Sequence, residues 1–204
     1  MSPLEIVAVV VNAFGVWLTT QRLRWCWPVG LVAVLLYGWL FFEVKLYSDM
    51  LLQLVYALLQ GYGWWRWSRG QVVAGKVRVE RLTPCSLRNG LLAGAIGGAA
   101  LGFTMHRLTD AALPWLDSML AAYCLVASLW AARRQVASWW LWIVLDAIYV
   151  GLYAFKNLPL TAGLYAAFVV LAVIGLRSWH AALLEQERAE PPAEGSEVEA
   201  VVQG

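Results

Sequence analysis

Residues 141–155 read LWIVLDAIYVGLYAF, an almost wholly apolar run that contains a single carboxylate, Asp146. No helix breaker or polar neighbour marks the end of an element here, as a cap or turn in a water-soluble protein would require. The composition gives the context: 61% of the 204 residues are hydrophobic and 14% are charged, against about a quarter charged in soluble domains. The sequence therefore predicts an all-α membrane protein that crosses the bilayer several times.

Seven apolar windows have the length that a bilayer core demands of a helix. They fall near residues 4–20, 25–42, 49–67, 88–105, 112–132, 139–155 and 158–179. The first lacks the basic region and cleavage pattern of a secretory signal, so we expect a retained span. The segment 68–87 is polar and basic and should be a loop, and the acidic tail from Glu185 should be disordered.

The basic residues are unevenly divided between the two sides of the membrane that these spans imply. Of the 15 Lys and Arg residues, all but Lys45, Arg107 and Lys156 fall on the side of the C-terminus. Basic loops stay in the cytoplasm, which places the C-terminus there and the N-terminus in the periplasm. The net charge of +2 is too small to indicate a nucleic-acid partner.

The chain also resembles itself at an offset of 112 residues. The offset pairs Arg22 with Arg134, Trp27 with Trp139, Tyr37 with Tyr149, Gly63 with Gly175 and Trp67 with Trp179. This predicts two parallel three-helix repeats joined by a linker helix, one of the repeat arrangements of transporters. The expected units are a first repeat (1–67), a basic cytoplasmic loop with the linker helix (68–111), a second repeat (112–180) and a disordered tail (181–204).

Polar residues inside the predicted spans lie at helical spacing. Trp142, Asp146, Tyr149 and Tyr153 share one face, and the third span repeats the pattern with Asp49, Gln53, Tyr56 and Gln60. A charge near the bilayer centre costs at least about 2.5 to 3.5 kcal/mol, so this face should turn inward to a partner, water or a ligand. Asn12 and Ser128 add single hydrogen-bonding groups.

Each of these residues also has a structural interpretation. Asp146 could bridge to a tyrosine hydroxyl or a helix-end amide, and Asp49 could be a charge at a helix start. Asn12 and Gln60 could hydrogen-bond neighbouring helices. Trp25, Trp64, Trp65 and Trp67 are expected to be anchors at the lipid headgroups.

The cavity that these residues predict would suit a planar, polar molecule with a positive charge. Aromatic faces attract cations and stack on flat rings, while glutamine and asparagine offer paired donors and acceptors. No cofactor or metal is expected, because Cys26, Cys85 and Cys124 are widely spaced and suit apolar packing. An intramembrane enzyme is the alternative from another class, but His106 and His180 fall at opposite membrane edges and could not serve a buried site.

Two long stretches carry a family resemblance. WCWPVGLVAVLLYGWLFFEVKLYSDMLLQLVYALLQGYGWWRW (25–67) and RRQVASWWLWIVLDAIYVGLYAFKNLPLTAGLYAAFVVLAVIGLRSW (133–179) resemble the PnuC family of bacterial vitamin transporters. The resemblance implies a seven-helix protomer like that of the SWEET proteins, assembled as a homotrimer in the inner membrane. It also implies facilitated diffusion of nicotinamide riboside, or of thiamine or riboflavin, through an alternating-access site, with trapping by phosphorylation inside.

The resemblance carries over by position to particular residues. The matching positions are Lys45, Tyr47, Asp49, Gln53, Tyr56, Trp139, Trp142, Asp146, Tyr149, Tyr153 and Tyr165. The family's nicotinamide riboside members have a glutamine where this chain has Ser128, and the region of Asn12 and Phe14 also departs from the common pattern. With the inward-facing polar residues, the expected substrate-binding set is Asn12, Tyr37, Asp49, Gln53, Tyr56, Ser128, Trp139, Trp142, Asp146, Tyr149, Tyr153 and Tyr165.

Overall fold

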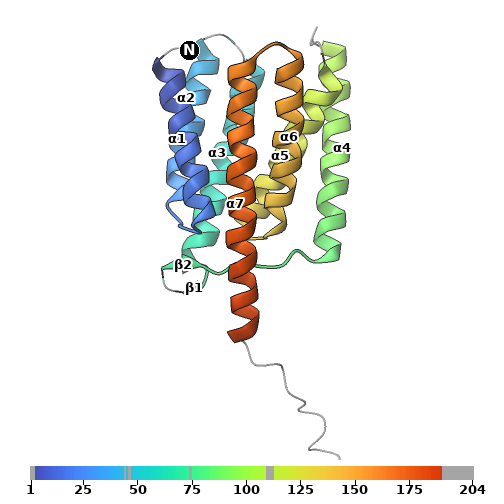
Figure 1. Cartoon of the computed structure of the whole chain (residues 1–204). Helices are drawn as coiled ribbons and strands as arrows, with labels where there is room; N and C mark the ends of the chain where they lie inside the picture. The colour runs from blue at the N-terminus through green and yellow to red at the C-terminus, as the bar shows by residue number, and fades with distance from the viewer. Residues whose placement is uncertain (1–2, 44, 46, 74, 109–112, 190–204) are drawn as a thin grey trace, which may run out of the picture.

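The computed structural model is an upright bundle of helices with a small hairpin at one end (Figure 1). It describes residues 3–43, 45, 47–73, 75–108 and 113–189. These contain seven helices, α1 (Pro3–Thr20), α2 (Cys26–Glu43), α3 (Tyr47–Ser68), α4 (Pro84–Leu108), α5 (Pro114–Ala132), α6 (Ala137–Phe155) and α7 (Pro159–Ala189). Strands β1 (Val72–Val73) and β2 (Lys76–Val77) pair antiparallel, and we call this end of the bundle the hairpin end.

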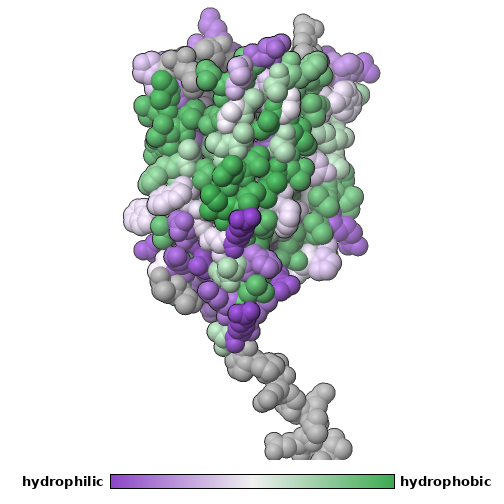
Figure 2. Space-filling view, in the orientation of Figure 1, coloured by the Kyte–Doolittle hydropathy of each residue, from purple (hydrophilic) through white to green (hydrophobic). Residues whose placement is uncertain are grey.

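The helices have the length and composition of a multi-pass membrane protein, as predicted. Six of the seven in the described part of the chain, all except α3, are long and apolar enough to cross a bilayer. Helix α3 has 22 residues, but Gln53, Gln60 and Arg66 lower its hydropathy. Figure 2 shows apolar residues banding the bundle, with hydrophilic residues at both ends and most of them at the hairpin end.

Several helices end in the same backbone turn. Arg22, Arg134 and Asn157 have left-handed φ angles of 60°, 62° and 57°. After each one, the next N–H donates to a carbonyl five residues back, at 3.1 Å for Leu23 to Leu18 and 2.9 Å for Gln135 to Trp130. This is the Schellman stop, which satisfies the last carbonyls of a helix. Arg22 and Arg134 are separated by the 112-residue offset of the sequence.

The first three and the last three helices meet along two seams. Helix α1 packs against α7, and α3 packs against α5. Helix α4 lies at the edge of the bundle against α5, where the buried Gly94, Gly98 and Gly102 allow close approach (Figure 1). The space between the seams is therefore enclosed by six helices.

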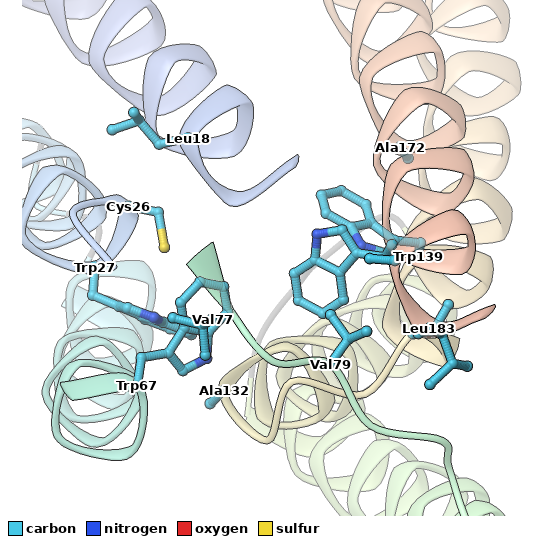
Figure 3. Close-up of a cluster of buried hydrophobic side chains, with 13 residues drawn as sticks. Leu18, Cys26, Trp27, Trp67, Val77, Val79, Ala132, Trp139, Ala172 and Leu183 are labelled. Carbon is cyan, nitrogen blue, oxygen red and sulfur yellow. The ribbon is translucent and has the colours of Figure 1, made fainter. Parts of the chain in front are cut away.

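Four tryptophans form the core at the hairpin end (Figure 3). Trp67 and Trp179 are both 0% exposed and their ring centroids are 5.8 Å apart. Trp27 meets Trp67 edge to face at 5.5 Å, and Trp139 meets Trp179 in the same way at 5.5 Å. The prediction that Trp67 is a headgroup anchor is thus wrong, because its ring packs inside the bundle.

Two indole hydrogen bonds tie the halves of the bundle to each other. Trp67 Nε1 donates to the carbonyl of Ala131 at 3.2 Å, and Trp179 Nε1 donates to the carbonyl of Thr19 at 2.9 Å. Donors and acceptors are both separated by the 112-residue offset. Each half therefore holds the end of the first helix of the other half.

The second strand of the hairpin and the residues that follow it span the same end of the bundle. The N–H of Val77 donates to the carbonyl of Arg22 at 3.1 Å, and the N–H of Glu80 donates to the carbonyl of Arg134 at 2.9 Å. The Glu80 carboxylate also forms an ion pair with Arg134. The chain between α3 and α4 thus joins the equivalent turns of both halves.

Helix α7 continues well beyond the predicted span. It ends at Ala189 and projects past the hairpin (Figure 1). Arg81 donates to both carboxylate oxygens of Glu187, at 2.5 and 2.8 Å, and this hydrogen bonding raises the pKa of the Arg81 guanidinium. Residues 181–189, which were expected in a disordered tail, are therefore helical, and 190–204 lie outside the described residues.

Candidate functional site

A cavity of about 450 Å³ lies between the two halves of the bundle. Helices α1, α2, α3, α5, α6 and α7 all contribute to its lining. Its volume is in the range of small-molecule sites, roughly 300 to 1,000 Å³. Its walls combine aromatic rings with a few polar groups, which is the usual composition of such sites.

Most of the residues predicted to bind substrate face this cavity. The lining includes Asn12, Tyr37, Gln53, Tyr56, Ser128, Trp139, Trp142, Asp146, Tyr149 and Tyr165. Helical periodicity predicted Gln53, Tyr56, Trp142, Asp146 and Tyr149, because it gives the direction of each side chain around its helix. The other residues came from single polar groups, the 112-residue offset and the family resemblance. Their role in binding stays a prediction.

Asp146 is buried at the cavity wall, and no other described residue pairs with its carboxylate. It is 6% exposed, and within the described part of the chain it accepts no hydrogen bond and forms no ion pair. The proposed bridge to a tyrosine hydroxyl or a helix-end amide is not formed by these residues. A buried charge without hydrogen bonds is costly, so this carboxylate calls for a ligand, water or a proton from the cavity.

Stacked tyrosines form the wall beside Asp146. Tyr149 and Tyr165 have ring centroids 4.6 Å apart, and Tyr153 stacks on Tyr165 at 5.3 Å. Tyr149 and Tyr165 line the cavity, whereas Tyr153 does not. Tyr153 therefore contacts the lining residue Tyr165 without itself facing the cavity.

Asp49 also lies outside the cavity lining. It is exposed in the first turn of α3, where a carboxylate interacts favourably with the helix dipole. The matching Lys45 is exposed as well, in the turn before α3. The side chain of Tyr47 is outside the described part of the structure. The helix-start interpretation of Asp49 therefore suits its position.

Several lining residues were absent from the predicted set. They include Thr19, Cys26, Trp27, Phe41, Gln60, Cys124 and Phe168. The 112-residue offset could have found Trp27 and Phe168, because these correspond to Trp139 and Tyr56. Gln60 lies on the same predicted inward-facing stripe as Gln53 and Tyr56, and it lines the cavity with them.

Two indole donors beside the cavity are unused. The Nε1 atoms of Trp27 and Trp139 are buried, and neither has an acceptor among the described residues. Both side chains line the cavity at its hairpin end and correspond to each other through the 112-residue offset. Unsatisfied buried donors are uncommon, so a bound polar molecule would complete this region.

The two walls of the cavity differ chemically although they come from equivalent helices. Positions related by the offset carry Val34 and Asp146, Gly30 and Trp142, Gln53 and Tyr165, and Gln60 and Ala172. The carboxylate stands on one wall and both glutamines on the other. The two walls of the cavity are therefore chemically asymmetric.

Residues 2–181 match a protein family described as nicotinamide mononucleotide transporter, which includes the PnuC proteins. The chain belongs to the PnuC family. It is 29% identical over 175 residues to the nicotinamide riboside transporter PnuC of Escherichia coli (strain K12), covering 74% of this chain and 73% of that protein. It is 26% identical over 196 residues to the riboflavin/roseoflavin transporter RibM of Streptomyces davaonensis, covering 94% and 90%.

A solved structure agrees with this membership in the PnuC family. The crystal structure of the vitamin B3 transporter PnuC superposes with a TM-score of 0.73 at 27% identity, covering 89% of this chain and 82% of that one. The family resemblance seen in the sequence is therefore confirmed. The protein is a multi-pass membrane transporter, and the alternative of an intramembrane enzyme is wrong.

Proposed function

We propose that this protein carries nicotinamide riboside, or a closely related vitamin, into the bacterial cell through the cavity between its halves. The observation that carries the proposal is the buried carboxylate of Asp146, to which no other described residue is paired, in a cavity walled by aromatic rings. A pyridinium cation would neutralise Asp146 and interact favourably with the faces of Trp142 and Tyr149. The names of the Escherichia coli and Streptomyces relatives support a vitamin as cargo.

The same chemistry ranks the alternative substrates. Thiamine is also a cationic heterocycle and would suit Asp146, whereas riboflavin has a neutral ring system. The family's nicotinamide riboside members carry a glutamine at the position of Ser128. The smaller serine leaves more room in the cavity, so the contact that the glutamine would make with the sugar or the ring of the substrate differs here. Thiamine is therefore the second candidate, and riboflavin the third.

The proposed architecture has seven spans in two parallel, SWEET-like repeats. Residues 1–67 form the first repeat, 68–111 the loop and linker helix α4, and 112–180 the second repeat. The paired Schellman turns and the reciprocal bonds of Trp67 and Trp179 support this symmetry. Helix α3 would then be the remaining span, with Gln53 and Gln60 turned away from lipid into the cavity.

The proposed setting is the bacterial inner membrane, with the hairpin end in the cytoplasm and the N-terminus in the periplasm. Basic residues such as Arg69, Arg78 and Arg81 gather at the hairpin end, as the positive-inside rule requires. A homotrimer, as in the family, would cover part of the exposed apolar surface of the helices. The bilayer, the vitamin and further copies of the chain are thus the expected partners.

Transport would proceed by alternating access, with the two halves rocking about the cavity. Opening to the cytoplasm requires Trp67 and Trp179 to separate, since they join the halves there. The sequence carries no nucleotide-binding motif that could drive active transport. Net uptake would therefore follow the gradient and depend on trapping of the cargo by phosphorylation.

Calorimetry of the purified protein with nicotinamide riboside, thiamine and riboflavin tests the substrate. We expect saturable binding of the two cations, tighter for nicotinamide riboside, and return of the ligand unmodified. Binding of riboflavin alone would overturn the role of Asp146. Accumulation above the external concentration in proteoliposomes without a kinase would overturn facilitated diffusion.

A further inference from the structure

The amide of Gln60 is seated against the backbone of the neighbouring helix at Gly30. A Cβ atom at position 30 would lie 2.7 Å from both the Oε1 and Nε2 atoms of Gln60. Such a distance is too short for any side chain, so only glycine at this position of α2 leaves room for the amide. Both residues line the cavity.

This amide has no hydrogen bond within the described part of the chain. The alternative interpretation of Gln60, a hydrogen bond to a neighbouring helix, is therefore not realised by these residues. A carboxamide offers two donors and two acceptor sites, and Gln60 is half-buried at the cavity wall. The amide edge is available to a molecule in the cavity.

At the equivalent place in the second half of the bundle, the large and the small side chain have exchanged helices. The offset relates Gly30 to Trp142 and Gln60 to Ala172, which is buried. On one side the small residue is on α2 and the large one on α3, while on the other the indole is on α6 and the small residue on α7. The cavity thus presents an amide from one half and an indole from the other at corresponding depth.

We propose that Gln60, positioned by Gly30, is a specificity-determining residue that hydrogen-bonds an amide carried by a flat ring lying against Trp142. This deepens the proposed function and depends on it. A carboxamide pairs with another carboxamide through one donated and one accepted hydrogen bond, so Gln60 matches the substituent that distinguishes nicotinamide riboside from a bare pyridinium riboside. Asp146 supplies attraction for the cation, and Gln60 selects the substituent.

The test compares two ligands that differ only in this group, nicotinamide riboside and 1-ribosylpyridinium, by calorimetry on the full-length protein in detergent. Net hydrogen bonds contribute up to about 1.5 kcal/mol, so Gln60→Ala should weaken nicotinamide riboside binding about tenfold. Binding of 1-ribosylpyridinium should change less than about twofold. Equal losses for both ligands, or no loss for either, would overturn the inference while leaving the proposed function intact.

Gly30→Ala provides a second route to the same result without removing Gln60. The three atoms nearest to the new methyl group all belong to the flexible end of Gln60, so the variant should fold while the amide is displaced. We expect the same selective loss, and no further loss when Gly30→Ala is added to Gln60→Ala. An additional loss in that double variant would contradict positioning through Gln60.

Gly38→Ala on the same helix is the matched control. Its Cβ would lie 3.6 Å from Cβ of Gln53, an ordinary contact, and Gly38 does not line the cavity. Both affinities should stay within about twofold of the wild-type values. If the wild-type chain binds neither ligand, the proposed function itself fails, and this inference fails with it.

Discussion

The two halves of the chain are alike at the hairpin end of the bundle but differ around the cavity. At the hairpin end, residues 112 positions apart are alike and make equivalent contacts, as Trp67 and Trp179 do with the carbonyls of Ala131 and Thr19. Around the cavity, the same offset relates unlike residues, such as Val34 and Asp146. Packing between two equal halves favours equal residues, whereas one small asymmetric ligand favours different groups on its two sides.

The largest loss of stability is expected at the two glycines that pack against the equivalent tryptophans. A Cβ added to Gly63 would lie 2.3 Å from the ring of Trp27, and one added to Gly175 would lie 2.6 Å from the ring of Trp139. Both rings are buried and cannot easily move, so Gly63→Ala and Gly175→Ala should each destabilise the protein by about 2 to 3 kcal/mol. Thermal unfolding in detergent measures this.

Gly61→Ala and Gly163→Ala are the controls for these glycines, because an added Cβ meets nothing within 4 Å at either position. Unequal losses at Gly63 and Gly175 would break the equivalence of the two halves.

The next largest effect tests the asymmetry of the cavity, in which one wall alone carries the Asp146 carboxylate. Asp146→Asn keeps the shape of the side chain but removes its charge, and hydrogen bonds to a charged group contribute about 1.5 to 3 kcal/mol. We expect the affinity for nicotinamide riboside and thiamine to fall at least tenfold and that for riboflavin to change much less. Calorimetry with the three ligands decides, and an equal loss for all three would exclude a charge-specific role.

A somewhat smaller effect is expected for the aromatic wall. Trp142→Ala should weaken binding of a cationic ring about tenfold, because stacking and cation–π contacts are lost. Trp140→Ala on the same helix is the control, since Trp140 is exposed on the outer surface. Ligand-dependent quenching of tryptophan fluorescence and calorimetry can measure both variants. Similar losses in the two variants would indicate a general effect on the helix.

The smallest effect is expected for the indole hydrogen bonds at the hairpin end. Trp67→Phe and Trp179→Phe keep an aromatic ring and remove one N–H donor, at a cost of about 1 kcal/mol each in the free energy of unfolding. Because the bonds are equivalent, the two losses should agree, and thermal unfolding provides the comparison. A loss in only one variant would show that the halves are tied unequally.

Much of the cavity could be predicted because helices impose a simple period on the sequence. Trp142, Asp146 and Tyr149 lie on one face, and an acidic residue in a membrane span must turn away from lipid. The period gives a direction around the helix axis but no position along the bundle relative to other helices. Tyr153 and Asp49 therefore share the predicted faces yet lie outside the cavity lining.

The local sequence pattern also could not predict which side chains are buried by residues distant in the sequence. Trp67 and Trp65 both lie near the end of an apolar run, where indoles commonly meet the headgroups. Only the packing of α3 beside α5 and α7 distinguishes the buried Trp67 from the exposed Trp65.

The amino-acid sequence by itself determined the membrane environment, the helical spans, the internal repetition and the family, because these depend on composition, length and order along the chain. The tertiary structure decided which polar groups are left without partners. The residue types of Asp146, Gln60 and Trp139 already show that each side chain can form hydrogen bonds. Whether a neighbouring helix comes close enough to use that capacity depends on how the six surrounding helices pack.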